Sequence, residues 1–167
     1  RLRGDVEGAF AAFAKARTFG IEPQPGEALL RCSQGDSEAA WAELRIALAA
    51  ADRLSRMRLL RGAVEIALAR GDLDEAEQHC TDLAAGAATF GTPGFKAWAA
   101  HARGALLVRR GRHADALEVL STALREYRVQ QSRYETAEVY DWMALAHRGM
   151  GAEDAARADE ATAASIY

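Results

Sequence analysis

A glycine is followed by an alanine five residues later at five places along this 167-residue chain. The pairs are Gly4/Ala9, Gly35/Ala40, Gly71/Ala76, Gly111/Ala116 and Gly151/Ala156. Successive glycines are 31, 36, 40 and 40 residues apart. Repeats of this length are typical of stacked helical hairpins, in which each hairpin has too little core to fold alone and buries one face against its neighbours. The sequence therefore predicts an all-α fold, a solenoid of antiparallel helical hairpins.

The third unit indicates why each pair predicts the turn of a hairpin. Gly71 follows an apolar-rich stretch and can adopt the left-handed conformation that ends helices at low cost. Asp72 can cap the next helix with its carboxylate, and Glu75 completes a pair that resembles a capping box. We expect Ala76 to lie where the two helices come closest, because a larger side chain there would push the hairpin apart.

Two breaks interrupt this pattern, and with the turns they define nine expected helices. Prolines disfavour helix at residues 22–26, and the stretch 91–94 predicts a long loop between units. Arg112 and Ala152 replace the aspartate after the turn glycine, so weaker caps are expected there. The expected helices span residues 6–19, 26–33, 36–52, 55–70, 72–88, 95–110, 113–129, 134–149 and 153–167.

Composition narrows the function classes. The formal net charge is −3, which argues against direct nucleic-acid binding by these residues. No apolar stretch is long enough for a membrane helix, and no signal segment opens the chain, so a cytoplasmic protein without membrane contact is expected. Cys32 and Cys80 lie far apart, as reduced thiols on helix faces would. The chain opens at Arg1 in mid-unit, without a methionine, which predicts a fragment of a longer protein.

The stretch from Arg70 to Ala76, Arg-Gly-Asp-Leu-Asp-Glu-Ala, resembles the inter-helix turn of the tetratricopeptide repeat (TPR). Small residues also agree with that family at two further positions of the unit, with Val64 and Leu83 as exceptions. They are Ala28, Gly104 and Ala144 before the turn, and Ala16, Ala47, Ala123 and Ala163 after it. The resemblance covers the whole chain and implies a right-handed superhelix forming a single repeat domain over residues 1–167.

A narrower resemblance concerns residues 22–35, Glu-Pro-Gln-Pro-Gly-Glu-Ala-Leu-Leu-Arg-Cys-Ser-Gln-Gly, preceded by the opening Arg-Leu-Arg-Gly-Asp. These segments are similar to the repeat region of large bacterial LuxR-type transcription regulators, and residues 162–167 look like the last helix of such an array. This resemblance implies an interaction or sensory module ahead of a carboxy-terminal helix-turn-helix. DNA binding would then belong to that missing domain, since no residue here matches a recognition helix.

In TPR arrays the first helix of each unit lines the concave face, where partner segments are usually held. Counting back from the turn glycines places nine residues of this chain there. They are Arg58, Arg61, Glu65, Trp98, His101, Arg109, Glu138, Asp141 and Arg148. An aromatic ring between guanidinium groups and carboxylates could grip a peptide or a small effector. The alternative is that these side chains form solvated faces and ion pairs between helices.

Other candidate sites carry weaker patterns. The arginine-rich run 53–61 could attract an acidic partner, or it could be the solvated face of a helix held by Leu54, Met57 and Leu60. The four histidines lack metal-ligand spacing, and no phosphate-binding glycine loop is present. No catalytic constellation is visible. We therefore expect no enzymatic activity, no metal and no cofactor.

Three functions remain as expectations. The first is a non-catalytic module that binds a protein, peptide or small effector and regulates the output of a transcription regulator. The second is a stand-alone TPR scaffold or adaptor without DNA-linked output. The third is a regulatory appendage of an ATPase or cyclase. Apolar ends left at residues 6–19 or 155–167 also predict homo-oligomers through exposed repeat ends.

Overall fold

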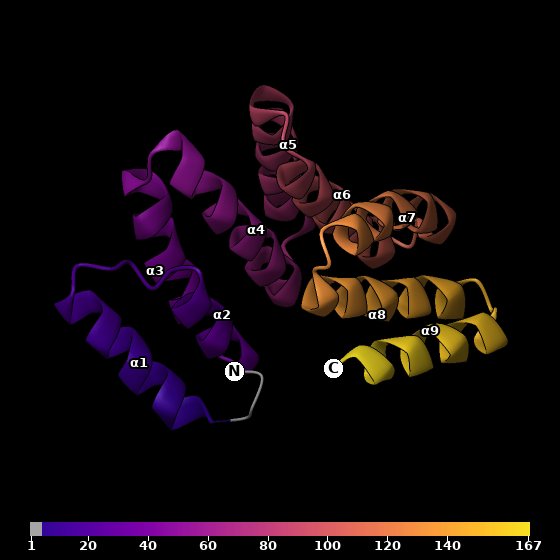
Figure 1. Cartoon of the computed structure of the whole chain (residues 1–167), viewed down its shortest axis with the longest axis horizontal. Helices are drawn as coiled ribbons and strands as arrows, with labels where there is room; N and C mark the ends of the chain where they lie inside the picture. The colour runs from indigo at the N-terminus through magenta and orange to yellow at the C-terminus, as the bar shows by residue number, and fades with distance from the viewer. Residues whose placement is uncertain (1–4) are drawn as a thin grey trace. The chain divides into compact units, whose positions relative to one another are not determined.

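The computed structural model describes residues 5–167, which form nine α-helices and no strands (Figure 1). The all-α prediction is confirmed. The helices are α1 (Val6–Thr18), α2 (Gly26–Ser33), α3 (Ser37–Ala50), α4 (Arg53–Arg70), α5 (Leu73–Phe90), α6 (Pro93–Arg109), α7 (His113–Val129), α8 (Arg133–Gly149) and α9 (Glu153–Ile166). Within the described range, no helix combines the length and apolar character needed to cross a membrane.

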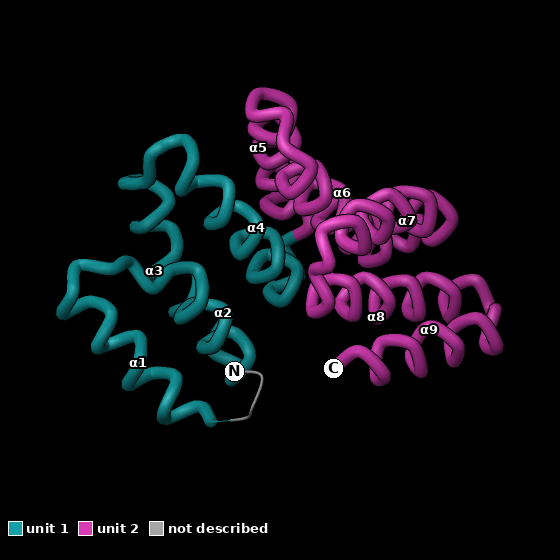
Figure 2. Tube along the Cα trace, viewed as in Figure 1, with its two compact units in different colours: residues 1–72 teal, residues 73–167 magenta. Residues whose placement is uncertain are grey.

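The chain divides into two compact units, with the boundary between Asp72 and Leu73 (Figure 2). In unit 1, α2 packs against α3 and α4, α3 packs against α4, and α1 packs against α2. In unit 2, each helix from α5 to α9 packs against the next, and α6 also contacts α8. The first helices of neighbouring hairpins therefore lie side by side within each unit. The single repeat domain and its superhelical arrangement stay predictions.

The repeat glycines form one recurring turn. Gly35, Gly71, Gly111 and Gly151 all have φ between 73° and 90°, in the left-handed region. After each helix the glycine N–H donates to the carbonyl three residues earlier, and the next N–H donates to the carbonyl five residues earlier. This pair of bonds is the Schellman motif, which satisfies the last carbonyls of a helix. Four of the five predicted turns are thus confirmed, while Gly4 lies outside the described residues.

The small residues of the repeat lie in the core. The alanines five residues after the turn glycine, Ala40, Ala76, Ala116 and Ala156, are all 0% exposed. Gly104, one of the small residues before the turn, is buried against α7, and a Cβ there would lie 2.5 Å from the Cγ and Cδ2 atoms of Leu120. The small residues at these repeat positions therefore lie where two helices pack closely together.

The structure corrects the predicted loop at residues 91–94. Pro93 is the first residue of α6, and the Thr92 hydroxyl accepts a hydrogen bond from the Phe95 N–H at 3.3 Å. Proline is well suited to the first helical position because its missing N–H would have no partner inside the helix. Helix α4 likewise begins at Arg53, two residues before its expected start, and the Asp52 carboxylate caps it by accepting from the Leu54 and Ser55 N–H groups.

The weaker caps expected in the later units are confirmed. No side-chain hydrogen bond caps α7 at Arg112 or α9 at Ala152, whereas the Asp36 carboxylate accepts from the Ala39 N–H at 3.3 Å. The turn persists without the cap because the glycine, not the aspartate, ends the preceding helix.

We predict that Gly104→Ala destabilises the protein by about 1–3 kcal/mol, because the added methyl group must displace the fully buried Leu120. Urea unfolding followed by circular dichroism measures this change. Gly94→Ala is the matched control, since its Cβ would meet Gln130 Oε1 at 3.4 Å, an ordinary contact. Equal stability of the two variants would contradict the close approach of α6 and α7.

Among the described residues other than glycine, Gln131 has a positive φ, at 56°. It lies between α7 and α8, and the same pair of Schellman hydrogen bonds forms there. We predict that Gln131→Gly stabilises the protein by about 1 kcal/mol, because glycine adopts this conformation without the steric cost of a Cβ. The thermal midpoint measures the effect. A lower midpoint would show that the Gln131 side chain contributes more than its backbone conformation costs.

Candidate functional site

The predicted binding residues of unit 1 follow one stripe of α4. Arg58 is exposed, while Arg61 and Glu65 are half-buried. The structure brings Arg61 and Glu65 together as an ion pair, with 3.9 Å between Arg61 Nε and Glu65 Oε1. Their spacing of four residues accounts for this contact, since residues four apart are neighbours on a helix surface.

The three predicted residues of α6 lie on one side of the helix but differ in exposure and in partner. Arg109 is exposed, and its guanidinium lies 5.6 Å from the ring centroid of Trp142 on α8, at cation–π distance. His101 is 7% exposed, and its Nδ1 lies 3.4 Å from the Tyr127 hydroxyl of α7. Trp98 is half-buried and packs against Phe95, with 5.3 Å between ring centroids. Arg109 therefore borders α8, whereas His101 is turned toward α7.

On α8, Glu138, Asp141 and Arg148 share one face. Tyr134 and Leu145 belong to the same face, because positions 134, 138, 141, 145 and 148 follow one another at alternating spacings of four and three residues. Leu145 is 44% exposed, so this face combines charge with accessible apolar surface. Among the predicted binding residues of unit 2, those on α8 are therefore more accessible to solvent than those on α6.

One end of that face contacts α9, and the other contacts Tyr167, the residue that follows α9. The Tyr167 hydroxyl donates to Asp141 Oδ2 at 2.6 Å, and its ring meets the Tyr134 ring edge-to-face. Burial, and then the hydrogen bond to Asp141, raise the pKa of Tyr167 well above its usual value, so the phenol stays protonated. Arg148 pairs with Glu160 at 2.8 Å and with Glu153 at 3.6 Å. The binding role of the nine predicted residues stays a prediction.

A second polar site, in unit 1, was missed by the sequence analysis. Its centre is Glu27 of α2, which is only 3% exposed. The Glu27 carboxylate accepts hydrogen bonds from both terminal nitrogens of Arg17 on α1, one of them at 3.3 Å. It also pairs with Arg31 one turn later, at 3.5 Å. A buried carboxylate requires such partners, because an unpaired charge in the interior is strongly destabilising.

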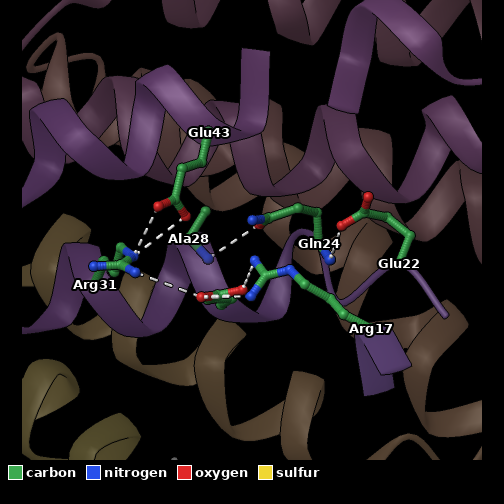
Figure 3. Close-up of polar contacts among 7 residues, drawn as sticks. Arg17, Glu22, Gln24, Ala28, Arg31 and Glu43 are labelled. Atoms are coloured by element: carbon green, nitrogen blue, oxygen red, sulfur yellow. Dashed lines mark hydrogen bonds and ion pairs between the residues drawn. The ribbon is translucent and has the colours of Figure 1, made fainter. Parts of the chain in front are cut away.

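Figure 3 shows this network extending to α3 and to the segment before α2. Arg31 Nε reaches Glu43 Oε1 of α3 at 3.1 Å. The Oε1 atom of the buried Gln24 accepts from the Ala28 N–H at 3.1 Å, which gives one N–H group in the first turn of α2 a partner. The Gln24 N–H in turn donates to Glu22 Oε1 at 3.1 Å. The network ties three helices of unit 1 together through charge and hydrogen bonds.

A third cluster joins α5 to α6 in unit 2. Glu77 accepts from Arg103 at 2.5 Å and from Arg110 at 2.6 Å. The hydrogen bond from Arg103, followed by the charges of both arginines, lowers the pKa of Glu77. Cys80, one turn further on, is buried, and this burial raises the pKa of its thiol to about 11. The thiol is therefore protonated at neutral pH and a poor nucleophile.

Among residues 5–167, no group of three or more histidine, cysteine, aspartate or glutamate side chains is placed to hold a metal ion. No protein-family model and no curated protein sequence matches the chain.

We predict that Glu77 stabilises the folded protein at neutral pH and that this contribution disappears in acid. Its folded-state pKa lies below the ordinary value of 4.5, so the contribution is present above that pH and is lost as the pH falls through the folded pKa. At pH 7 the thermal midpoint of Glu77→Gln should therefore lie below that of the original protein, and the difference should narrow as the pH falls below 4.5 and vanish once the pH is below the folded-state pKa. Glu118→Gln, at an exposed position of α7, controls for the lost charge. A gap that persists in acid would contradict an electrostatic origin.

Proposed function

We propose that the hairpins stack into a right-handed superhelix of the TPR type and that this module binds a protein or peptide partner without catalysing a reaction. One observation carries the proposal most directly. In unit 2, α6 and α8 are the first helices of successive hairpins, and they lie side by side. A ligand laid across them would meet residues from both hairpins, which is how a repeat array builds an extended binding surface.

The chemistry of the α6–α8 face suits an extended peptide with basic and apolar side chains. Glu138 and Asp141 supply carboxylates, and Leu145 supplies exposed apolar surface. Beside them, the Arg109 guanidinium lies over the Trp142 ring in a cation–π contact. Tyr167 already shows that an aromatic side chain with a hydroxyl group can dock on Asp141. We infer that a partner segment would compete with Tyr167 for this position.

To test partner binding, peptides that bind the intact chain are first selected from a displayed random-peptide library. We expect the selected peptides to carry lysine or arginine beside an apolar residue. Asp141→Lys should weaken their binding about tenfold or more, because it replaces a carboxylate with a charge that repels a basic peptide, and Arg109→Ala should weaken it by removing the guanidinium over Trp142. Arg125→Ala, at an exposed position of α7, is the matched control for Arg109→Ala. Unchanged affinity in both test variants would refute this face as the binding surface.

The proposed biological setting is the regulation of a bacterial LuxR-type transcription regulator, in the cytoplasm, with DNA bound by a separate helix-turn-helix domain. Support comes from the sequence resemblance and from the turn geometry shared by the repeats. An effector on the array would act only if it bound two arrangements of the hairpins with different affinity. The second candidate, a scaffold without DNA-linked output, follows from the same surface without that resemblance.

Determining the gene sequence downstream of the codon for Tyr167 separates these two candidates. A compact basic helix-turn-helix there supports the regulator. Further repeats or a stop codon contradict the regulator and leave the scaffold, for which affinity capture of protein partners is then the appropriate experiment.

A further inference from the structure

Helix α1 is attached to unit 1 in an unusual way. It contains no buried residue, whereas each other described helix contains at least two. Among the helices of unit 1, it packs against α2. Because the free energy that holds a helix in place comes mainly from its buried apolar face, α1 has little of the usual stabilisation.

Three side chains on one face of α1 hold it to α2. Phe10, Phe13 and Arg17 are spaced by three and four residues and therefore point the same way. The Arg31 guanidinium lies 5.2 Å from the centroid of the Phe10 ring. The Phe13 ring packs so closely on Gly26 that a Cβ there would lie 3.2 Å from it. Arg17 binds the Glu27 carboxylate.

We call the surface formed by Gly26, Glu27 and Arg31 the α1 seat. The α1 seat selects for a helix with a basic side chain, because the Glu27 carboxylate is buried beneath α1 and needs a positive partner. Glu27 is 3% exposed with α1 in place, while the Arg17 side chain is half-exposed. Release of α1 would remove one charged partner from Glu27 but leave Arg31 (Figure 3). Detachment therefore breaks an ion pair and two ring contacts without opening the apolar core of unit 1, which is typical of segments that open locally.

Part of the segment that joins α1 to α2, residues 19–23, can serve as a hinge, while Gln24 and Pro25 stay in place against α2 and α4. Five extended residues span roughly 15 Å or more, enough for α1 to leave its own seat. Phe19 is 69% exposed and Ile21 is 59% exposed, so two large apolar side chains of this segment lie in water. Burying them against another surface would be favourable.

We propose that unit 1 exchanges α1 with a second copy of the chain, each α1 docking on the other copy's seat. The second copy supplies the one helix whose fit to this seat is shown, with Phe10, Phe13 and Arg17 in the same register. The two hinge segments run past each other in the exchanged dimer and bury Phe19 and Ile21 between the copies. Exchange of an identical element is an inexpensive route to a dimer, because both forms contain the same helix contacts.

The test reverses the charges of the Arg17–Glu27 pair in separate full-length chains. In Arg17→Glu and in Glu27→Arg, α1 is repelled by its own seat and by the seat of an identical copy. When the two are mixed, each α1 finds an oppositely charged seat in the other chain. Light scattering should therefore report monomers for each variant alone and twice the chain mass for the mixture.

Two controls make the result specific. The double variant Arg17→Glu/Glu27→Arg restores the match within one chain, so it should behave as the original protein does and leave either single variant monomeric when mixed with it at the same concentration. Arg53→Glu changes an exposed arginine of α4 and should likewise leave Glu27→Arg monomeric when the two are mixed. A mixture of the two single variants that stays monomeric, with both shown to be folded by circular dichroism, overturns the proposal.

A second measurement decides the matter if Glu27→Arg does not fold. The full-length Arg17→Glu chain, altered at a half-exposed side chain, is titrated with a fluorescein-labelled peptide of residues 5–18. Its vacated seat should bind this peptide about tenfold more tightly than it binds the same peptide carrying Arg17→Glu, as expected for loss of a charged hydrogen bond. Equal affinity for the two peptides overturns the proposal.

Discussion

The structure depends on a backbone conformation that recurs at the end of each repeat's first helix. A residue in the left-handed region ends the helix with two Schellman hydrogen bonds, and an alanine five residues later is fully buried at Ala40, Ala76, Ala116 and Ala156. The turn sets the direction in which the chain reverses, and the small side chain allows the next helix to pack closely. The side-by-side placement of α6 and α8, and with it the proposed binding face, follows from these two constraints.

The ends of the described helices could be predicted from sequence to within two residues, because glycine, proline and capping residues act locally. The one misplaced loop shows the limit of the same reasoning: the stretch 91–94 predicts a loop, although Pro93 suits the first helical position that it occupies. The turn at Gln131 was also difficult, since nothing in the residue type favours positive φ there.

Side-chain partners were far less predictable than helices. Counting from the turn glycines correctly grouped Glu138, Asp141 and Arg148 on one face of α8, because helical periodicity fixes such positions. It did not separate His101, turned to Tyr127, from Arg109, over Trp142, since which neighbour a helix meets depends on tertiary packing. The Glu27 network was missed because Arg17 and Glu43 approach it from different helices, and one sequence gives no signal for contacts across a proline-containing segment.

The central claim is that these hairpins form an extended repeat array, and small-angle X-ray scattering of the intact chain tests it most directly. A compact globular domain of this length has a radius of gyration of about 15 Å. At concentrations where the chain is monomeric, a solenoid should give a distinctly larger value and a pair-distance distribution with a long tail. A radius near 15 Å with a symmetric distribution would contradict the repeat array and the extended binding surface that depends on it.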